Sequence, residues 1–203
     1  MRALLLIDLQ YDSMPGGALA VREGDAVVPV ANRLLADLPG VGCALAVATQ
    51  DWHPPGHRSF AAQHPGRSVG EVVDLDGLPQ VLWPVHCVQG TGGAALHADL
   101  DQARLTRVFV KGTNPAIDSY SGFWDNGHRQ STGLGEWLRA RGVTAVDVLG
   151  LATDYCVKFT ALDAAREGFG VRLHLAGCRA VDLAPGDGER AVEEMRRAGV
   201  EVV

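Results

Sequence analysis

Short apolar segments alternate with helix-like segments along most of this chain, and this alternation constrains the fold more than any other feature. The apolar segments have the length and composition of strands that are buried on both faces. They lie at residues 3–7, 44–48, 108–110, 145–149, 171–175 and 200–203. Strands that alternate with helices build a parallel sheet covered by helices, so we expect an α/β protein.

The segments between these strands divide into expected helices and one long irregular region. Apolar residues recur at helical spacing in residues 25–38, 131–141, 155–167 and 187–198. The third of these helices has Cys156 near its start and ends before Gly168, a residue typical of helix C-terminal caps. Residues 52–93 are rich in Pro, Gly, His and polar residues without a clear period. A connection of that length in a compact protein is usually functional.

Length and composition limit the kind of protein. A chain of 203 residues with 47% hydrophobic content and no low-complexity stretch is expected to form one domain over residues 1–203. The net charge of -6 leaves no basic patch for a nucleic acid. The apolar run at 3–7 is too short for a signal peptide or a membrane span, so we expect a cytoplasmic protein without a membrane partner. A monomer or a homodimer fits a small α/β chain.

Four cysteines are present, and their spacing limits what they can do. They are Cys43, Cys87, Cys156 and Cys178. Because no CxxC pair occurs, neither a disulfide scaffold nor a thiolate zinc site is indicated.

Charged side chains follow several expected strands at the point where each strand ends. Asp8, Asp51 and Lys111 come directly after apolar segments, and residues 150–156 follow another and lead to Cys156. The carboxyl ends of parallel strands meet at one edge of a sheet, where ligands bind in open α/β folds. We therefore expect these side chains to form one site.

A carboxylate, a lysine and a thiol at one site make a workable catalytic triad. A helix N-terminus and a nearby cation favour the thiolate of Cys156, the candidate nucleophile. Asp8 is then the proton acceptor and donor, and Lys111 stabilises the thiolate. The alternatives are a small buried cysteine on the core face of a helix and a surface ion pair between Asp8 and Lys111.

A second group of residues has the composition of a metal site. Asp51 and His53 leave one strand end together, His57 follows, and His86 lies in the sequence WPVHCV. A carboxylate with imidazoles suits one divalent ion, either zinc, iron or manganese. The alternative is that the DxH spacing arises by chance and that the loop histidines are merely solvated.

Five sequence blocks resemble one known family, in its order and over nearly the whole chain. They are IDLQYD, ATQDWHPPGHRSFA, LWPVHCVQGT, KGTNPAIDSYSGF and GLATDYCVKFTALDA. The family is that of the bacterial nicotinamidases (pyrazinamidases) of the isochorismatase-like cysteine hydrolase superfamily. The resemblance implies a six-stranded parallel sheet with helices on both faces. It also implies hydrolysis of nicotinamide, and of pyrazinamide, through a cysteine thioester in NAD salvage.

The resemblance also implies roles for individual residues. By motif, the catalytic triad is Asp8, Lys111 and Cys156, and the metal ligands are Asp51, His53 and His86, with water completing the shell. The metal would bind the pyridine nitrogen of the substrate. His57 and Ser59 are left open as further ligands or neighbours of the ligands.

The remaining family features concern the walls of the pocket. An oxyanion hole would form from the amides of Ala152 and Cys156, after a cis peptide bond between Leu151 and Ala152. Trp83 and Tyr120 match the aromatic residues that line the substrate pocket.

The chain departs from the family at its first block, where DLQNDF is usual. Tyr11 replaces the asparagine and Ser13 replaces the phenylalanine. Either Met14 or another apolar group fills the missing wall, or the pocket admits substituted pyridines. The alternative functions are another isochorismatase-like amide or carbamoyl hydrolase, a non-catalytic binding protein that retains the pocket, and a thiol redox protein that uses Cys156 with Cys87.

Overall fold

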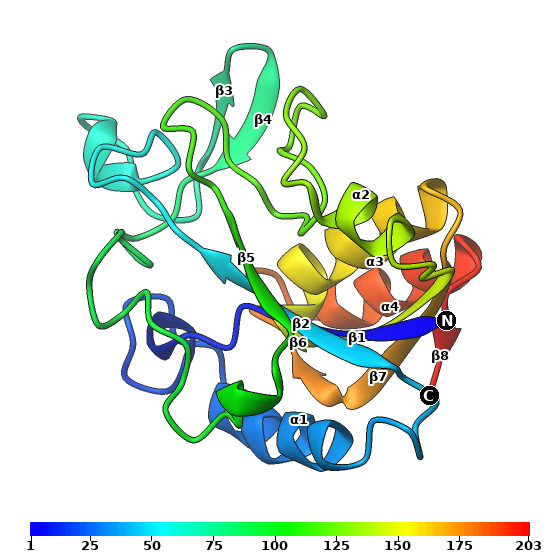
Figure 1. Ribbon diagram of the computed structural model, residues 1–203. Helices are drawn as coiled ribbons and strands as arrows, with labels where there is room; N and C mark the ends of the chain where they lie inside the picture. Colours follow the sequence, from blue (N-terminus) through cyan, green and yellow to red (C-terminus); the bar gives the residue numbers. More distant parts are fainter.

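A computed structural model describes residues 1–203, and a six-stranded parallel sheet forms its centre (Figure 1). The strand order is β5-β2-β1-β6-β7-β8. In that order the strands are Arg107–Lys111, Leu45–Asp51, Arg2–Ile7, Ala145–Leu151, Gly170–Arg179 and Glu201–Val202. The predicted six-stranded parallel α/β fold is therefore confirmed.

The two central strands, β1 and β6, are almost entirely buried because helices cover both faces of the sheet. In β1, the run from Ala3 to Ile7 is fully buried, and β1 pairs with β2 on one side and β6 on the other. The outer strand β5 instead alternates, with Val108 and Val110 exposed and Phe109 buried. Burial on both faces explains why β1 reads as a continuous apolar run.

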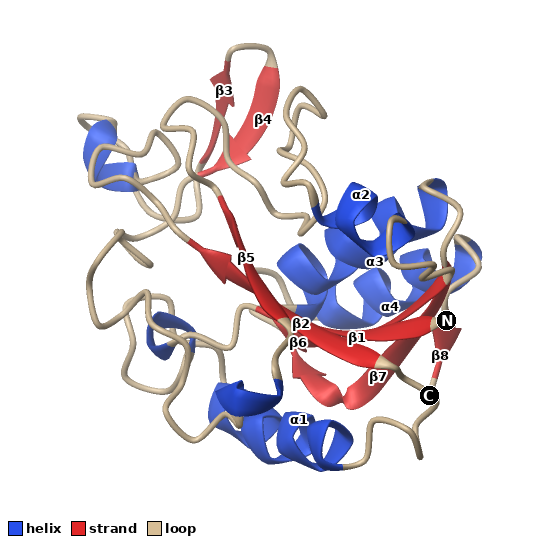
Figure 2. Cartoon of the chain, in the orientation of Figure 1, coloured by secondary structure: helices blue, strands red, loops and turns tan.

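Helices cover both faces of the sheet, as predicted (Figure 2). Helix α1 lies on one face, and α2, α3 and α4 lie on the other (Figure 1). Their bounds are Val27–Ala36, Leu134–Arg139, Lys158–Arg166 and Asp187–Arg197. Short 3₁₀ turns occur at Tyr11–Ser13, Gly24–Ala26, Ala61–Gln63 and Gln102–Arg104. None of the helices has both the length and the apolar composition that crossing a membrane requires.

Helix α2 is shorter than the predicted helix at 131–141, and its start has a physical cause. Gly133 has a φ of 83°, a left-handed conformation that is not helical, so the helix begins after it. Before it, the Ser131 hydroxyl accepts a hydrogen bond from the Gly133 amide and forms a turn.

The irregular region at 52–93 contains an antiparallel hairpin that the sequence reading missed. Strand β3 covers Val72–Leu75 and pairs with β4 at Leu78–Val81. Asp76 and Gly77 form the turn with φ angles of 54° and 85°. Positive φ at both central residues is typical of a type I′ turn, for which Asp-Gly is a strong sequence signal. The Asp-Gly signal is present, but it lies in a region that is polar and irregular overall.

The topology brings one set of strand ends together. Strand β1 lies between β2 and β6. The chain therefore places β2 and β5 on one side of β1 and β6, β7 and β8 on the other side. In open α/β sheets, this switch creates a crevice at the carboxyl ends of the strands. Gly150 permits the close approach of β6 to β1, because a Cβ there would lie 2.2 Å from the Ile7 carbonyl oxygen.

Candidate active site

The three predicted triad residues lie together at this crevice. Lys111 Nζ is 2.9 Å from Asp8 Oδ2 and 3.3 Å from Cys156 Sγ. All three are largely removed from solvent, with exposed fractions of 3%, 2% and 9% for Asp8, Lys111 and Cys156. Asp8 follows β1, Lys111 ends β5, and Cys156 follows β6, so the sheet holds each residue in place.

Lys111 is held as an ammonium ion by two carboxylates. Its Nζ donates to Asp51 Oδ1 at 2.6 Å and to the Ser119 carbonyl oxygen at 2.9 Å, in addition to its ion pair with Asp8. Burial lowers the pKa of this lysine, but Asp51 and Asp8 outweigh burial and raise the pKa well above its ordinary value. The site therefore has a permanent positive charge beside the thiol.

Asp8 keeps part of its capacity to accept a proton. The Thr49 hydroxyl donates to Asp8 Oδ1 at 2.6 Å, while Oδ2 faces the lysine as an ion pair without hydrogen-bond geometry. Burial raises the pKa of the Asp8 carboxyl and outweighs the opposing effect of Lys111. A carboxyl with a raised pKa can both accept and donate a proton near neutral pH.

Cys156 lies in a π-helical turn, Thr153–Val157, which continues into α3. The predicted position near a helix start is therefore confirmed, but the pKa of the thiol shifts in the opposite direction from the one that the helix start and the cation favour. Burial raises the pKa of the Cys156 thiol well above its ordinary value, despite the opposing charge of Lys111. Desolvation exceeds the effect of the cation, so the resting sulfur holds its proton and needs a proton acceptor.

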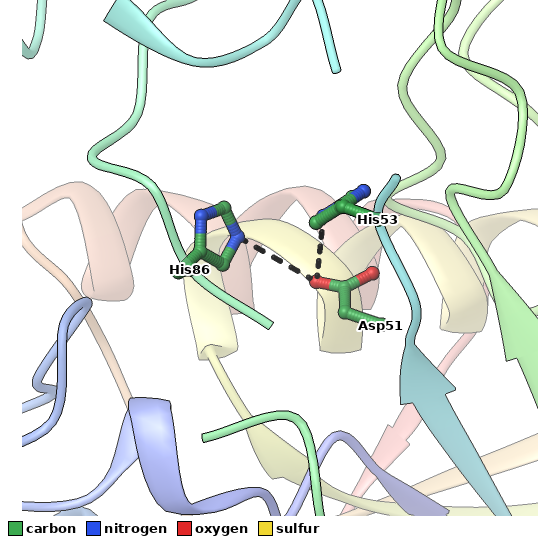
Figure 3. A group of neighbouring side chains, drawn as sticks. All are labelled: Asp51, His53 and His86. Carbon is green, nitrogen blue, oxygen red and sulfur yellow. Dashed lines mark ion pairs between the residues drawn. The ribbon is translucent and has the colours of Figure 1, made fainter. Parts of the chain in front are cut away.

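Asp51, His53 and His86 form the group shown in Figure 3. The Nε2 atoms of His53 and His86 lie 3.7 Å and 4.0 Å from Asp51 Oδ2. The Nδ1 atoms lie 2.9 Å from the Gly112 carbonyl oxygen and 2.8 Å from that of Pro84. A carbonyl partner favours a proton on Nδ1, so Nε2 is the nitrogen of each ring that faces the Asp51 carboxylate and could bind a metal ion. This donor set fits a divalent ion.

His57 and Ser59, which the sequence left open, contact each other. His57 is fully buried, its Nδ1 lies 2.7 Å from Ser59 Oγ, and its Nε2 has no hydrogen-bond partner. Its ring centroid is 4.4 Å from that of His53. His53, His57 and Asp118 place their ligand atoms within 4.8 Å of one another. His57 is thus a neighbour of the first group and shares His53 with it.

A cavity with about 450 Å³ of empty volume, open solvent at its mouth included, is lined by Cys156 and by two residues of the histidine group, Asp51 and His86. Its wall consists of Asp8, Ser13, Leu19, Val21, Asp51, Trp83, His86, Asp118, Tyr120, Leu151, Ala152, Tyr155, Cys156 and Val181. Trp83 Nε1 donates to the Tyr120 hydroxyl at 3.2 Å. Both predicted pocket aromatics therefore line the cavity.

The wall beside Ser13 has apolar neighbours other than Met14. Leu19 and Val21 line the cavity together with Ser13, and the Val21 amide donates to the Ser13 carbonyl oxygen at 3.1 Å. Met14 is buried and does not line this cavity.

The segment before the nucleophile has the expected cis peptide bond between Leu151 and Ala152. Ala152 and Cys156, the expected oxyanion-hole residues, both line the cavity. The sequence reading missed Asp154 between them. Its carboxylate accepts hydrogen bonds from the amides of Val181 and Asp182 at 2.9 Å and 2.8 Å. This contact holds Val181, which lines the cavity, against the turn that contains Cys156. The only sequence signal for the contact was the acidic residue itself in the block GLATDYC.

Thr49 is a further residue that the sequence reading missed. It is a polar residue inside the apolar strand β2, and this interruption was a usable signal. Cys87, considered as a redox partner, is buried and does not line the cavity, and all four cysteines are free thiols.

The fold and this site together define a class of protein. The chain is a parallel α/β enzyme with a small, largely buried cavity at the strand ends, where a thiol, a carboxylate and an ammonium group meet.

Comparison with known proteins agrees with this class. The isochorismatase domain matches residues 2–203. Nicotinamidase from Escherichia coli is 54% identical over 98% of this chain and 92% of its own length. A solved Acinetobacter nicotinamidase/pyrazinamidase is 42% identical, with a TM-score of 0.94 over 100% of this chain and 95% of that chain. A Pyrococcus horikoshii pyrazinamidase, solved in complex with zinc, is 39% identical, with a TM-score of 0.79 over 100% and 98%. The chain belongs to the isochorismatase family.

Proposed function

We propose that this protein hydrolyses nicotinamide to nicotinate and ammonia, with Cys156 as the nucleophile, and that pyrazinamide is a second substrate. The observation that carries the proposal is the contact of Lys111 Nζ with both the Cys156 sulfur and the Asp8 carboxylate inside an aromatic-lined cavity. The high identity to a nicotinamidase over almost the whole chain supports nicotinamide as the amide.

The first half of the reaction forms a thioester. Cys156 gives its proton to Asp8 as the sulfur attacks the amide carbon, and a C–S bond forms. The Lys111 ammonium stabilises the negative charge that develops on the sulfur. The amides of Ala152 and Cys156 donate to the oxyanion, a contribution typically worth about 3 kcal/mol per donor. Asp8 then protonates the nitrogen, the C–N bond breaks, and ammonia leaves.

The second half returns the enzyme to its starting state. Asp8 accepts a proton from a water molecule that attacks the thioester carbon, and the C–S bond breaks. The sulfur recovers its proton from Asp8, and the new carboxylic acid loses its remaining proton to solvent and is released as nicotinate. The raised pKa of Asp8 suits both directions of transfer, because the carboxyl can hold the proton between the two steps.

Asp51, His53 and His86 would hold the divalent ion in this proposal. When bound, the ion supplies a Lewis-acidic position for the pyridine nitrogen. Trp83 and Tyr120 then bind and orient the ring, which places its carboxamide beside Cys156. Exclusion of water by the buried walls strengthens each of these contacts.

The test compares ammonia release from nicotinamide, pyrazinamide and a linear carbamoyl compound, each with and without a chelator. We expect strong preference for the two aromatic amides, loss of activity with the chelator, and recovery when zinc is added back. A preference for the linear compound would instead indicate another amide or carbamoyl hydrolase of the same family. Ammonia release from nicotinamide at the level of the blank would contradict the proposal.

A further inference from the structure

Gln10 is a fully buried polar residue just beyond β1, and all of its side-chain hydrogen bonds go to backbone atoms. Its Oε1 accepts from the Asp51 amide at 2.8 Å, and its Nε2 donates to the Asp51 carbonyl oxygen at 2.8 Å. The same Nε2 donates to the Ala94 carbonyl oxygen at 2.8 Å. The side-chain amide therefore pairs with Asp51 as a neighbouring strand would.

This pairing replaces a sheet ladder that has ended. Backbone pairing between β1 and β2 stops at Leu6 and Ala48, three positions before Asp51. On the opposite side, Asp51 still pairs with Lys111 of β5. Without Gln10, the Asp51 peptide would be fixed on one side only, and its partly buried amide and carbonyl would lose these hydrogen-bond partners.

The position of the Asp51 peptide determines where two chemical groups meet. One carboxylate oxygen of Asp51 binds Lys111 at 2.6 Å, and the other faces the Nε2 atoms of His53 and His86. Asp51 is thus the one proposed metal ligand that also contacts the Lys111 ammonium group. A rotation of its peptide would move its oxygens away from both.

We propose that Gln10 is a positioning residue for metal binding, because its side-chain amide holds the Asp51 backbone in the orientation that ligation requires. This inference rests on the proposed role of Asp51 as a metal ligand. Loss of such supporting contacts around a metal site typically weakens metal affinity by about 10- to 100-fold.

The chain offers a matched control for the test. Gln50 Nε2 donates to the same Ala94 carbonyl oxygen, at 2.6 Å, and its side chain makes no hydrogen bond to Asp51. Gln10→Met and Gln50→Met therefore both remove a contact with Ala94, but only the first removes the pairing with Asp51. Zinc affinity is measured for both variants and the wild type by competition with a chromophoric chelator, and thermal unfolding is followed in parallel.

We expect Gln10→Met to bind zinc at least about tenfold more weakly than the wild type, and Gln50→Met to bind it as the wild type does. Excess zinc should restore most of the nicotinamide turnover of Gln10→Met. Equal affinity in all three proteins, or equal weakening in both variants, would overturn the inference. A wild type that binds no zinc would overturn the metal site itself, and this result is distinguishable because no variant is needed to observe it.

A second variant keeps the inference testable if Gln10→Met does not fold. Gln10→Glu has the same length and keeps the acceptor for the Asp51 amide, but it loses both donors. Its added negative charge attracts a cation, so electrostatics alone predicts tighter zinc binding. The positioning role predicts weaker binding. Unchanged or tighter binding in Gln10→Glu would contradict the role of Gln10.

Discussion

Two groups of buried charges lie on the same sheet and differ in how their carboxylates are satisfied. At the carboxyl ends of the strands, Asp8 keeps Oδ2 without a hydrogen bond, and burial raises its pKa. In the middle of β6, Asp147 is equally buried, but Arg2, Arg172 and His174 all contact it at 2.7 Å. Burial alone would raise the pKa of Asp147, yet these three donors lower it to about 2.

The difference separates a group that reacts from a group that stabilises. A carboxylate with saturated oxygens is a poor proton acceptor and contributes to folding in its charged form. A carboxylate whose burial is only partly compensated by its cation and donors contributes less to stability but can take up a proton during a reaction. Asp8 and Asp147 therefore predict opposite outcomes when each is replaced by asparagine.

Asp8→Asn should have the largest effect, and the effect should be on rate. It removes the proton acceptor while keeping the size of the side chain, so we expect kcat for nicotinamide to fall by roughly 10²- to 10⁴-fold. Lys111 keeps Asp51 and the Ser119 carbonyl as partners, so the free energy of unfolding should fall less than in Asp147→Asn. Ammonia release and urea denaturation measure the two quantities. Turnover at the wild-type rate would refute the role of Asp8.

Asp147→Asn should reverse this pattern. Removal of one charge from a buried group leaves its cations without a counter-charge, at a cost of about 3 kcal/mol of unfolding free energy. This is the lower end of the usual range, because the side chains of Arg2 and Arg172 are each 26% exposed. Activity at saturating nicotinamide should be unchanged. A folded Asp147→Asn protein with wild-type stability would contradict the stabilising role of Asp147.

The third prediction concerns acid. The pKa of Asp147 in the folded protein is about 2, against an ordinary value of 3.8. Because the folded pKa is depressed, the stabilisation is present above the ordinary value and is lost as the pH falls toward 2. It amounts to about 2 kcal/mol. The stability difference between the wild type and Asp147→Asn, from urea denaturation, should therefore narrow over this range. A constant difference would contradict the assignment.

Thr49→Val should give the smallest effect on activity, and it tests what sets the pKa of Asp8. The Thr49 hydroxyl donates to the Asp8 carboxylate at 2.6 Å and opposes the rise in its pKa. Without this bond, the pKa of Asp8 should rise further, and the acidic limb of the kcat/KM profile should move up by about one pH unit. An unmoved limb would show that the limb does not report Asp8.

Sequence patterns located the candidate site because it depends on strand ends. Asp8, Asp51 and Lys111 each follow an apolar segment, and parallel strands bring such positions together whatever the details of packing. The same reasoning gave the α/β class. Functional residues that directly follow a strand can thus be predicted from the sequence.

Features that depend on distant packing were not predictable in the same way. The pKa of Cys156 depends on how completely the surrounding walls exclude water, so the helix start and Lys111 suggested the wrong direction. Arg2, Asp147 and Arg172 come from three strands, and no local pattern connects them. The hairpin at Asp76 and Gly77 had a local signal, but its two short strands pair only with each other and most of their residues are not buried.

The most direct test of the central claim compares two cysteines, one from each region. Cys156 lines the cavity, whereas Cys43 is a buried thiol beside Asp147. Ammonia release from nicotinamide is measured for Cys156→Ala and Cys43→Ala under identical conditions. The account predicts a rate at the level of the blank for Cys156→Ala and a rate close to wild type for Cys43→Ala. A Cys156→Ala protein that retains the wild-type rate would contradict it.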